Sequence, residues 1–278
     1  FFISRNIVIK LPEGVPPAVA QSFAGLVPAA VAIVLIWFIR VLLNFDINAF
    51  FTWLLSPLVM GLGTLPGMLI LIFLISILWC CGIHGDNVLS GITSPIFLKY
   101  IAENTQAYLN HQPIPHITAD GFYIVFMCLG GTGATLGLVI SMLRSKSKLY
   151  KSVGELSLPS AIFCINEPVI FGFPIVFNPI MMIPFTITPM ILCTLTYALM
   201  YFNIIGRPVL QIPWTMPPIF AAYFVTGGNI PAVIWSVCTI VISVFVFLPF
   251  FKMAEKKQLE KEEAENRENL EPVLNSEI

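Results

Sequence analysis

Long apolar stretches run along most of the chain. Five of them are almost entirely apolar: residues 26–43, 51–83, 121–143, 168–206 and 208–251. Apart from Arg40 near the end of the first, they contain no charged residue. The last two are each roughly twice as long as the ~20 residues that one helical span requires. This pattern predicts helices that cross a membrane.

Prolines and glycines divide the longer stretches. They break the first part of residues 51–83, so we expect a bent or interfacial segment followed by a helix over about 67–79. Residues 121–143 are expected to form one span. The two proline-rich stretches are expected to contain full spans near 184–204 and 230–251, together with broken or re-entrant helix. The fold class is therefore an all-α polytopic membrane protein.

Composition supports this class and excludes others. Of the 278 residues, 57% are hydrophobic and only 10% are charged, and the mean hydropathy is +0.89. Residues 156–251 carry just two charges, Glu167 and Arg207. A soluble domain needs charged side chains over its whole surface. A water-soluble enzyme, a nucleic-acid-binding protein and a disordered chain are therefore excluded.

Cysteine spacing predicts no special chemistry. The six cysteines lie mostly within or beside apolar runs, and no pair has C-x-x-C spacing. We expect them to be small buried hydrophobic residues, and we predict no metal site, disulfide framework or cofactor. The chain opens Phe-Phe-Ile-Ser without a methionine. It is expected to be a fragment whose beginning is missing.

Lysine and arginine predict the orientation in the membrane. Residues 144–151, with one arginine and three lysines, form the densest basic cluster before the C-terminal tail. The positive-inside rule places this cluster in the cytoplasm. The Glu-rich tail, residues 252–278, is expected to be cytoplasmic too, as solvated helix or as disorder. Residues 100–120 contain no lysine or arginine and are expected outside.

Glu167 is the first candidate functional residue. An ionisable side chain in a membrane costs several kcal/mol unless it faces a cavity or a partner, so it marks a functional site by default. Proline is favoured in the first turn of a helix, so Glu167 is expected at the N-cap of a half-helix that starts at Pro168. The alternative is a capping carboxylate among the lipid headgroups. Arg207 is either a partner of Glu167 or an interfacial anchor.

His84 is the second candidate. It ends an uncharged run, and the glycines beside it allow a ligand to approach the backbone. The alternative is an ordinary interfacial histidine. Asp86 and Asn87 follow at once, so the region is a polar interruption, although Asp86 is also a plausible capping residue.

Other polar positions are weaker candidates. His111 and His116 are expected to be solvated loop residues. The glycine-rich residues 130–135 lack the Gly-Lys-Ser/Thr of a phosphate-binding loop, and their position within an apolar stretch favours close helix packing. Asn178 and Gln211 are candidates to line a polar path.

Several motifs resemble one family. Residues 82–85 (Gly-Ile-His-Gly) and 165–172 (Ile-Asn-Glu-Pro-Val-Ile-Phe-Gly) are followed by residues 174–179 and 183–185, and residues 12–20 precede the first span. Together they resemble the enzyme IIC permeases of the bacterial phosphotransferase system, in particular the lactose, cellobiose and diacetylchitobiose group. The resemblance covers about residues 5–254.

The resemblance implies an architecture and a site. It implies about five full spans plus two re-entrant helical hairpins whose tips meet the sugar. His84 would lie by the first hairpin and Glu167 at the tip of the second, with Asn166, Gly85 and Asn87 beside them in the sugar site. Glu167 would hold the 6-hydroxyl of the sugar and accept its proton during transfer.

The resemblance also implies domains and partners. Residues 1–60 would be the end of an N-terminal, dimer-side domain with the first span and a linker, residues 61–251 a transport domain, and residues 252–278 a charged cytoplasmic tail. The partners would be a disaccharide, the phosphoprotein enzyme IIB as a separate subunit, the lipid bilayer and, in the full-length protein, a second copy. No nucleic acid is expected. The location would be the bacterial inner membrane.

Two other functions remain open from the sequence. A proton-coupled secondary sugar transporter would use Glu167 and His84 to carry its proton. A subunit that serves only assembly is disfavoured by two ionisable residues in broken helices. Four aromatic residues are candidates to stack on a sugar ring, or else belong to the core: Phe171, Phe173, Trp214 and Tyr223.

Overall fold

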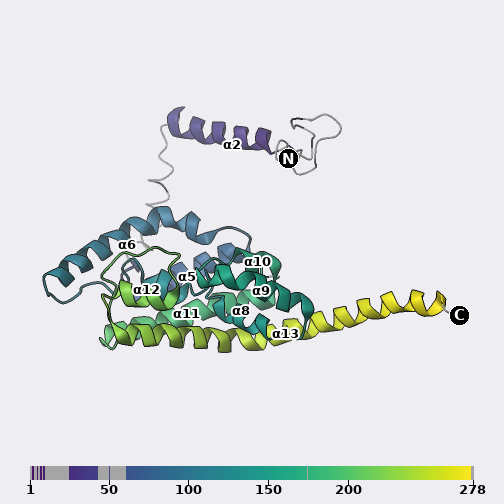
Figure 1. Cartoon of the computed structure of the whole chain (residues 1–278). Coiled ribbons are helices and arrows are strands. Elements are labelled where there is room, and N and C mark those ends of the chain that lie inside the picture. Colours follow the sequence, from purple (N-terminus) through teal and green to yellow (C-terminus); the bar gives the residue numbers. More distant parts are fainter. Residues whose placement is uncertain are drawn as a thin grey trace. The chain divides into compact units, whose positions relative to one another are not determined.

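The computed structural model describes residues 2, 5, 7, 9, 25–42, 50, 61–173 and 175–276, except for the side chains of Ile39 and of residues 265–276. Within this part of the chain the regular elements are all helices (Figure 1). The chain forms two compact units, residues 1–56 and 57–278. The motif at residues 12–20 and the expected bend over residues 51–60 fall outside the described residues.

The first unit contains one apolar helix. Helix α2, Leu26–Trp37, continues into a π-helical turn, η1, Phe38–Leu42. An apolar helix thus lies where the span over residues 26–43 was predicted, but its described part is shorter than a full span. Its apolar side chains are mostly exposed; Ile33, for example, is 67% exposed. A helix that is apolar on its exposed surface suits a lipid environment.

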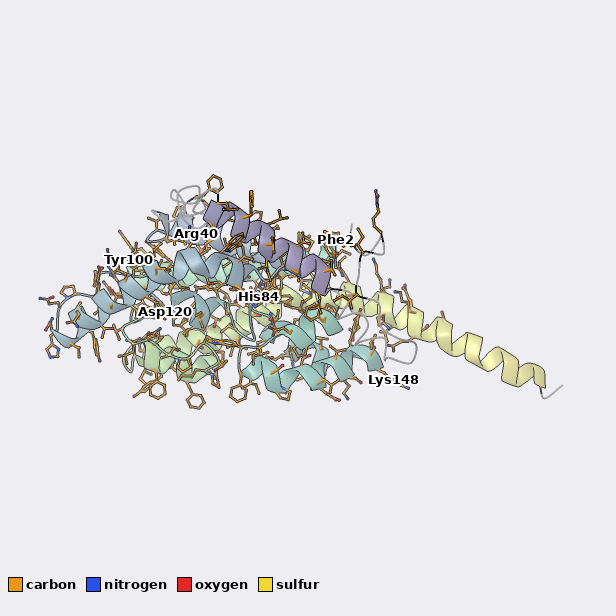
Figure 2. All side chains as sticks on the ribbon, turned by 90° about the horizontal axis from the view of Figure 1, so that it is seen from above. Phe2, Arg40, His84, Tyr100, Asp120 and Lys148 are labelled. Atoms are coloured by element: carbon orange, nitrogen blue, oxygen red, sulfur yellow. The ribbon has the colours of Figure 1, made fainter. Side chains whose placement is uncertain are left out.

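The second unit contains nine helices among its described residues. They are α5 (Leu65–Cys80), α6 (Gly85–Leu109), α7 (Phe122–Met127), α8 (Leu136–Leu143), α9 (Lys148–Ile162), α10 (Glu167–Gly172), α11 (Pro179–Tyr201), α12 (Pro218–Val225) and α13 (Ile230–Ser276). Figure 2 shows His84 in the middle of this unit. Tyr100 and Asp120 lie toward one end, and Lys148 lies toward the end from which α13 extends. The candidate site is therefore central along the unit.

Helix α13 has its polar side chains inside and its apolar side chains outside. Ser236, Thr239 and Ser243 are fully buried, whereas Ile234 and Phe245 are 61% and 68% exposed. The Ser243 hydroxyl donates a hydrogen bond to the carbonyl of Ala134 at 2.5 Å, and Thr239 donates to its own helix. This arrangement is typical of a helix in a bilayer, where polar side chains face the bundle and apolar ones face lipid.

The number of spans is not confirmed. Among the described residues only α11 and α13 contain an apolar stretch long enough to cross a membrane, as predicted near 184–204 and 230–251. The apolar helix α5 has 16 residues and matches the predicted helix over 67–79.

The prediction of one span over residues 121–143 is wrong. Only α7 and α8 are helical there, and residues 128–135 form a loop between them. Gly130, Gly131 and Gly133 have φ values of +74°, +104° and +84°, and Ala134 has φ +57°. A left-handed backbone favours glycine and interrupts a helix. The glycines therefore build a turn instead of a helix. Close packing is found both in this turn, where a Cβ on Gly133 would lie 2.4 Å from the Phe185 ring, and in α8, where Gly137 meets Ser243.

The charged tail continues α13 as helix, and its first part binds the basic loop. Glu255 accepts hydrogen bonds from the Ser145 hydroxyl at 2.6 Å and from the Lys146 N–H at 2.7 Å. Glu262 accepts from the Ser147 hydroxyl and from two backbone N–H groups at the start of α9. These hydrogen bonds lower the pKa of the Glu262 carboxyl, first of all the one from Ser147.

The cysteines are only partly buried. Cys80, Cys128 and Cys193 are buried as expected, whereas Cys81 and Cys238 are exposed. None of the six forms a disulfide.

Candidate functional site

His84 lies at the break between α5 and α6. Gly82, with φ +79°, turns the chain, and His84 is the N-cap of α6: its Nδ1 accepts a hydrogen bond from the Asn87 N–H at 3.2 Å. The ring of His84 also contacts Trp79, with 4.3 Å between centroids. His84 thus holds the cap position considered for Asp86. Gly85, the first residue of α6, packs directly against the backbone of α5: a Cβ on Gly85 would lie 2.4 Å from the Ile75 carbonyl oxygen.

Asp86 is the central hydrogen-bond acceptor of the site. Its carboxylate accepts from Trp79 Nε1 at 2.7 Å, from the Thr132 hydroxyl at 2.7 Å and from the Tyr123 hydroxyl at 3.0 Å. The capping interpretation of Asp86 is therefore wrong. The carboxylate connects α5, α6, α7 and the glycine loop. Hydrogen bonds to a charged group are among the stronger ones, so this network holds the walls of the site together.

The glycine loop connects this network to Asn166. The buried Asn166 side chain donates a hydrogen bond from Nδ2 to the Thr132 carbonyl at 2.7 Å. A Cβ on Gly131 would lie 2.4 Å from Asn166 Cγ, so only glycine permits this contact. Asn166 is also the N-cap of α10, and Glu167 is its first residue. Glu167 is thus one position inside the helix where the sequence predicted an N-cap.

Arg207 is not the partner of Glu167. Its Nη1 donates to the carbonyls of Ile114, at 2.5 Å, and Pro115, at 3.3 Å. It holds the loop that precedes α7, and the alternative of an interfacial anchor stays a prediction.

These elements surround a cavity of about 430 Å³, called here the inner cavity. It brings together His84 and Glu167, which are 83 positions apart in the sequence. Fourteen residues line it: Trp79, His84, Asp86, Asn87, Ser90, Tyr123, Ile124, Cys128, Gly131, Thr132, Cys164, Asn166, Glu167 and Trp214. Four of the five sequence candidates are among them; Gly85 is not, because it is used for helix packing.

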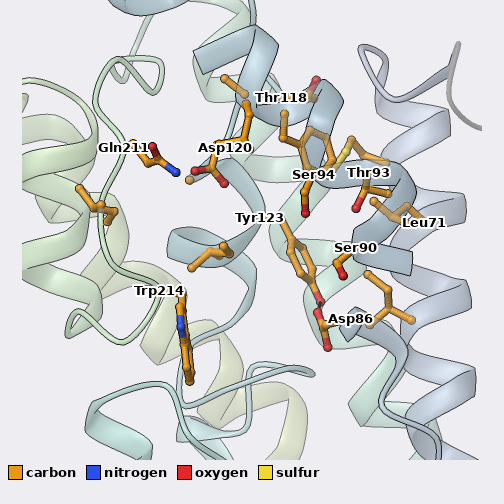
Figure 3. Close-up of a pocket in the computed structure, with 18 of the residues that line it drawn as sticks. Leu71, Asp86, Ser90, Thr93, Ser94, Thr118, Asp120, Tyr123, Gln211 and Trp214 are labelled. Carbon is orange, nitrogen blue, oxygen red and sulfur yellow. Dashed lines mark hydrogen bonds between the residues drawn. The ribbon is translucent and has the colours of Figure 1, made fainter. Parts of the chain in front are cut away.

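A second cavity of about 350 Å³, the outer cavity, adjoins the inner one. The two share five residues: Asp86, Ser90, Tyr123, Ile124 and Trp214. Figure 3 shows the Tyr123 hydroxyl directed at Asp86, and Asp120 facing Gln211 farther along the cavity. Gln211 therefore lines a cavity beside Asp120, whereas Asn178 caps α11 instead.

Of the four aromatic candidates for stacking on a sugar, only Trp214 lines a cavity. Trp214 lines both cavities, but Phe173 is fully buried against Tyr150. Phe171 and Tyr223 line neither cavity. The two loop histidines differ. His116 pairs with the Glu103 carboxylate and stacks on Tyr100, with 4.1 Å between ring centroids, so it is not simply solvated. His111 is exposed, as expected.

Comparison with known proteins identifies the family. The family model described as "Phosphotransferase system, EIIC" matches residues 1–189, more than half of the chain. The protein belongs to the EIIC family. The resemblance inferred from the motifs is thereby confirmed.

Related proteins of this family are permease components for sugars. The lichenan permease IIC component of Bacillus subtilis (strain 168) is 41% identical over 94% of this chain and 59% of its own length. The cellobiose-specific EIIC component of Geobacillus stearothermophilus is 36% identical over 95% of this chain and 60% of its own length. The chain thus spans about three fifths of the length of these relatives.

A solved structure has the same fold. The transporter ChbC, the IIC component of the N,N'-diacetylchitobiose-specific phosphotransferase system, superposes with a TM-score of 0.72. It is 36% identical, and the match covers 95% of this chain and 62% of that one. The all-helical fold of this chain is therefore that of a IIC transporter, and a place in the membrane agrees with the outward apolar stripe of α13.

Proposed function

We propose that this protein binds a β-linked disaccharide, of the cellobiose, diacetylchitobiose or lactose kind, in the inner cavity. It would carry the sugar across the bacterial inner membrane while enzyme IIB phosphorylates it. The observation that carries the proposal is the inner cavity itself, where the starts of two interrupted helices bring His84 and Glu167 together. The names of the relatives specify the carbohydrates lichenan, cellobiose and N,N'-diacetylchitobiose.

The charges of the cavity favour a neutral ligand. Its lining contains the carboxylates of Asp86 and Glu167 but no lysine or arginine. A sugar phosphate would therefore find acidic groups and no permanent cation. A neutral sugar offers hydroxyl groups that donate to carboxylates, and Trp214 offers an aromatic face for the ring. The cavity suits the substrate of group translocation better than its product.

Glu167 is proposed as the catalytic residue. Transfer moves the phosphoryl group from the phosphocysteine sulfur of enzyme IIB to O6 of the sugar, and the thiolate leaves. Phosphoryl transfer requires an aligned hydroxyl and a group that takes its proton. The exposed carboxylate of Glu167 would hold O6 and accept that proton. The chain itself would carry no phosphoryl group, and this chemistry requires no resident cofactor.

His84, Asn87 and Asn166 are proposed to bind the sugar. His84 Nδ1 is occupied by the Asn87 N–H, so the other ring nitrogen, Nε2, remains for a sugar hydroxyl. Asn166 donates from Nδ2 to the glycine loop and thereby also fixes the position of Glu167. Asn166 would thus serve both to bind the sugar and to position the Glu167 carboxylate.

The product of transport separates this function from a proton-coupled symporter. Membrane vesicles that contain the protein are supplied with radiolabelled sugar and phosphorylated enzyme IIB. Sugar phosphate inside the vesicles, formed only with the phosphorylated partner, supports group translocation. Uptake of unmodified sugar that follows a proton gradient would support the symporter. The names of the relatives favour the first outcome.

For the orientation, we propose that residues 144–151 and the tail are cytoplasmic and that residues 104–116 are external. The hydrogen bonds of Glu255 and Glu262 to the basic loop support a common side of the membrane for the loop and the tail. A cysteine at position 148 should resist impermeant thiol reagents in intact cells, and labelling there from outside would reverse the topology. We also propose that the full-length protein is a homodimer, which its mass in detergent would test.

A further inference from the structure

We propose that a third cavity, beside the start of the charged tail, binds the headgroup of an anionic phospholipid. This lipid cavity has a volume of about 210 Å³ and is lined by residues of α9, of the first turn of α11 and of the part of α13 that follows its apolar stretch. It shares no residue with the inner or the outer cavity. The proposal is therefore independent of which sugar the protein carries.

One wall of the lipid cavity is positively charged. Lys257 and Lys261 line it, and their spacing of four positions places them on the same face of α13, where like charges repel each other. Neither lysine forms a salt bridge with a described residue, and none of the described residues that line the cavity is acidic. The first turn of α11 adds the partial positive charge of a helix N-terminus. An anion between the two ammonium groups would remove their repulsion.

The nearby acidic residues of the tail are engaged on another face of the helix. Glu255 accepts from the Ser145 hydroxyl, and Glu262 accepts from the Ser147 hydroxyl and from backbone N–H groups of α9. Gln258, which lines the cavity, donates to Glu262 at 3.5 Å and lies where the two faces meet. The two carboxylates hold the basic loop, and the lysine face remains for an anionic ligand.

The other wall is apolar and decides between a lipid and a free phosphate compound. It consists of Ile180, Met181, Met253 and Ala254. A soluble phosphate compound gains nothing from such a wall, whereas a phospholipid places the glycerol and the first methylene groups of its acyl chains beside the phosphate. The volume lies below the roughly 300–1,000 Å³ of sites for whole drug-sized ligands, so the cavity suits a headgroup whose chains remain outside.

The cavity lies where α13 leaves the membrane. The apolar stretch ends at Phe251, whose ring centroid is 6.1 Å from those of Tyr150 and Phe173, and aromatic residues are typical of the membrane interface. A helix rises about 1.5 Å per residue, so Lys257 follows Phe251 by about 9 Å. Side chains of a helix lean toward its N-terminus, which for Lys257 means back toward the membrane. Basic pockets between helices at this level bind anionic lipid headgroups.

The experiment measures the affinity for two lipids that differ in charge. Native mass spectrometry of the detergent-solubilised protein, titrated with dioleoyl phosphatidylglycerol or dioleoyl phosphatidylcholine, gives a Kd for each. A lysine at the membrane surface contributes about fivefold to the affinity for anionic lipid, so the native protein should prefer phosphatidylglycerol by roughly 25-fold. The double variant Lys257→Gln/Lys261→Gln should lose this preference and keep its affinity for phosphatidylcholine. Lys257→Arg/Lys261→Arg should retain the preference.

Two other lysines of α13 provide the matched control. Lys252 and Lys256 are exposed and lie outside the cavity, so Lys252→Gln/Lys256→Gln makes the same change in charge and should keep the preference. Equal affinities of the native protein for the two lipids, or an equal loss in both glutamine variants, would overturn the proposal. Equal Tm values of the native protein and both variants in lipid-free detergent should show that any loss is not caused by misfolding.

Two further outcomes identify a different ligand. Glycerol 1-phosphate carries the phosphate without acyl chains and should not displace the lipid at equal concentration; displacement would show a site for free phosphate compounds. Unchanged lipid binding by Lys257→Gln/Lys261→Gln, together with slower phosphotransfer from enzyme IIB, would assign the two lysines to the protein partner. Either result would overturn the lipid site and leave the proposed function as it stands.

Discussion

Replacement of Asp86 by asparagine should destabilise the site measurably. In the native protein one carboxylate oxygen accepts from both Trp79 and Thr132, and the other accepts from Tyr123. Asparagine keeps one accepting oxygen and places an NH₂ group toward the Tyr123 hydroxyl. A hydrogen bond to a charged group contributes ~1.5–3 kcal/mol and a neutral one ~0.5–1.5 kcal/mol. The hydrogen bonds from Trp79 and Thr132 become bonds to a neutral group, so together they lose about 2–3 kcal/mol of their contribution to stability.

Thermal unfolding in detergent measures this loss. For a unit of this size, about 2–3 kcal/mol corresponds to a decrease in Tm of roughly 4–12 °C. Asp86→Ala should lower Tm further, because it leaves three donors without an acceptor. Glu155→Gln is the matched control, since it makes the same carboxylate-to-amide change at an exposed position of α9 outside both cavities, and it should leave Tm unchanged. Equal Tm values for Asp86→Asn and the native protein would refute the role of Asp86 as the acceptor that joins the cavity walls.

Three further changes test other parts of the structure. His84→Ala should weaken sugar binding and phosphotransfer by the same factor, as expected for uniform binding; a loss in transfer alone would contradict its place as a sugar ligand. Gly137→Val should cost about 1–3 kcal/mol of stability in a thermal unfolding assay, because a Cβ there would lie 2.3 Å from Ser243 Oγ. Gly91→Val, with no atom within 4 Å of its Cβ, is the control, and equal losses would contradict close packing of α8 on α13. Because the folded pKa of Glu262 is lowered from 4.5, its contact with α9 should persist above that pH and be lost as the pH falls through the lowered value. Amide exchange at Leu149 should then accelerate at low pH, and exchange without any pH dependence beyond the intrinsic rate would be inconsistent with this contact.

The membrane helices were predictable because their signal is local. Long runs without charges favour a span, and α11 and α13 occur where two of these runs were found. The glycine loop was not predictable in this way. Residues 121–143 are apolar throughout, and hydropathy does not distinguish a buried loop from a helix. The three glycines at 130, 131 and 133 were the available signal for positive φ, but small residues are equally common where helices pack closely.

The candidate site was predictable where a residue is unusual in its own segment. Glu167 and His84 are ionisable residues in apolar surroundings, and both line the inner cavity. The role of Asp86 depends on donors from distant positions, Tyr123 and Thr132, whose approach is a property of the fold. From the sequence, Asp86 could therefore be interpreted only as a capping residue or as part of a polar interruption. Gly85 was assigned to the sugar site by its position beside His84, but its packing against Ile75 depends on a contact that sequence spacing does not reveal.

Equilibrium sugar binding and the rate of phosphotransfer from enzyme IIB, measured on the same Glu167→Gln preparation, test the proposed function most directly. Glutamine keeps a hydrogen-bonding side chain of nearly the same shape but cannot accept the proton of O6. Binding should weaken only by about 1 kcal/mol, the contribution of a typical hydrogen bond. The rate of phosphotransfer to bound sugar should fall by ~10²- to 10⁴-fold, the usual contribution of general-base assistance. A Glu167→Gln protein that binds sugar weakly but phosphorylates it at the native rate would contradict the assignment of Glu167 as the base.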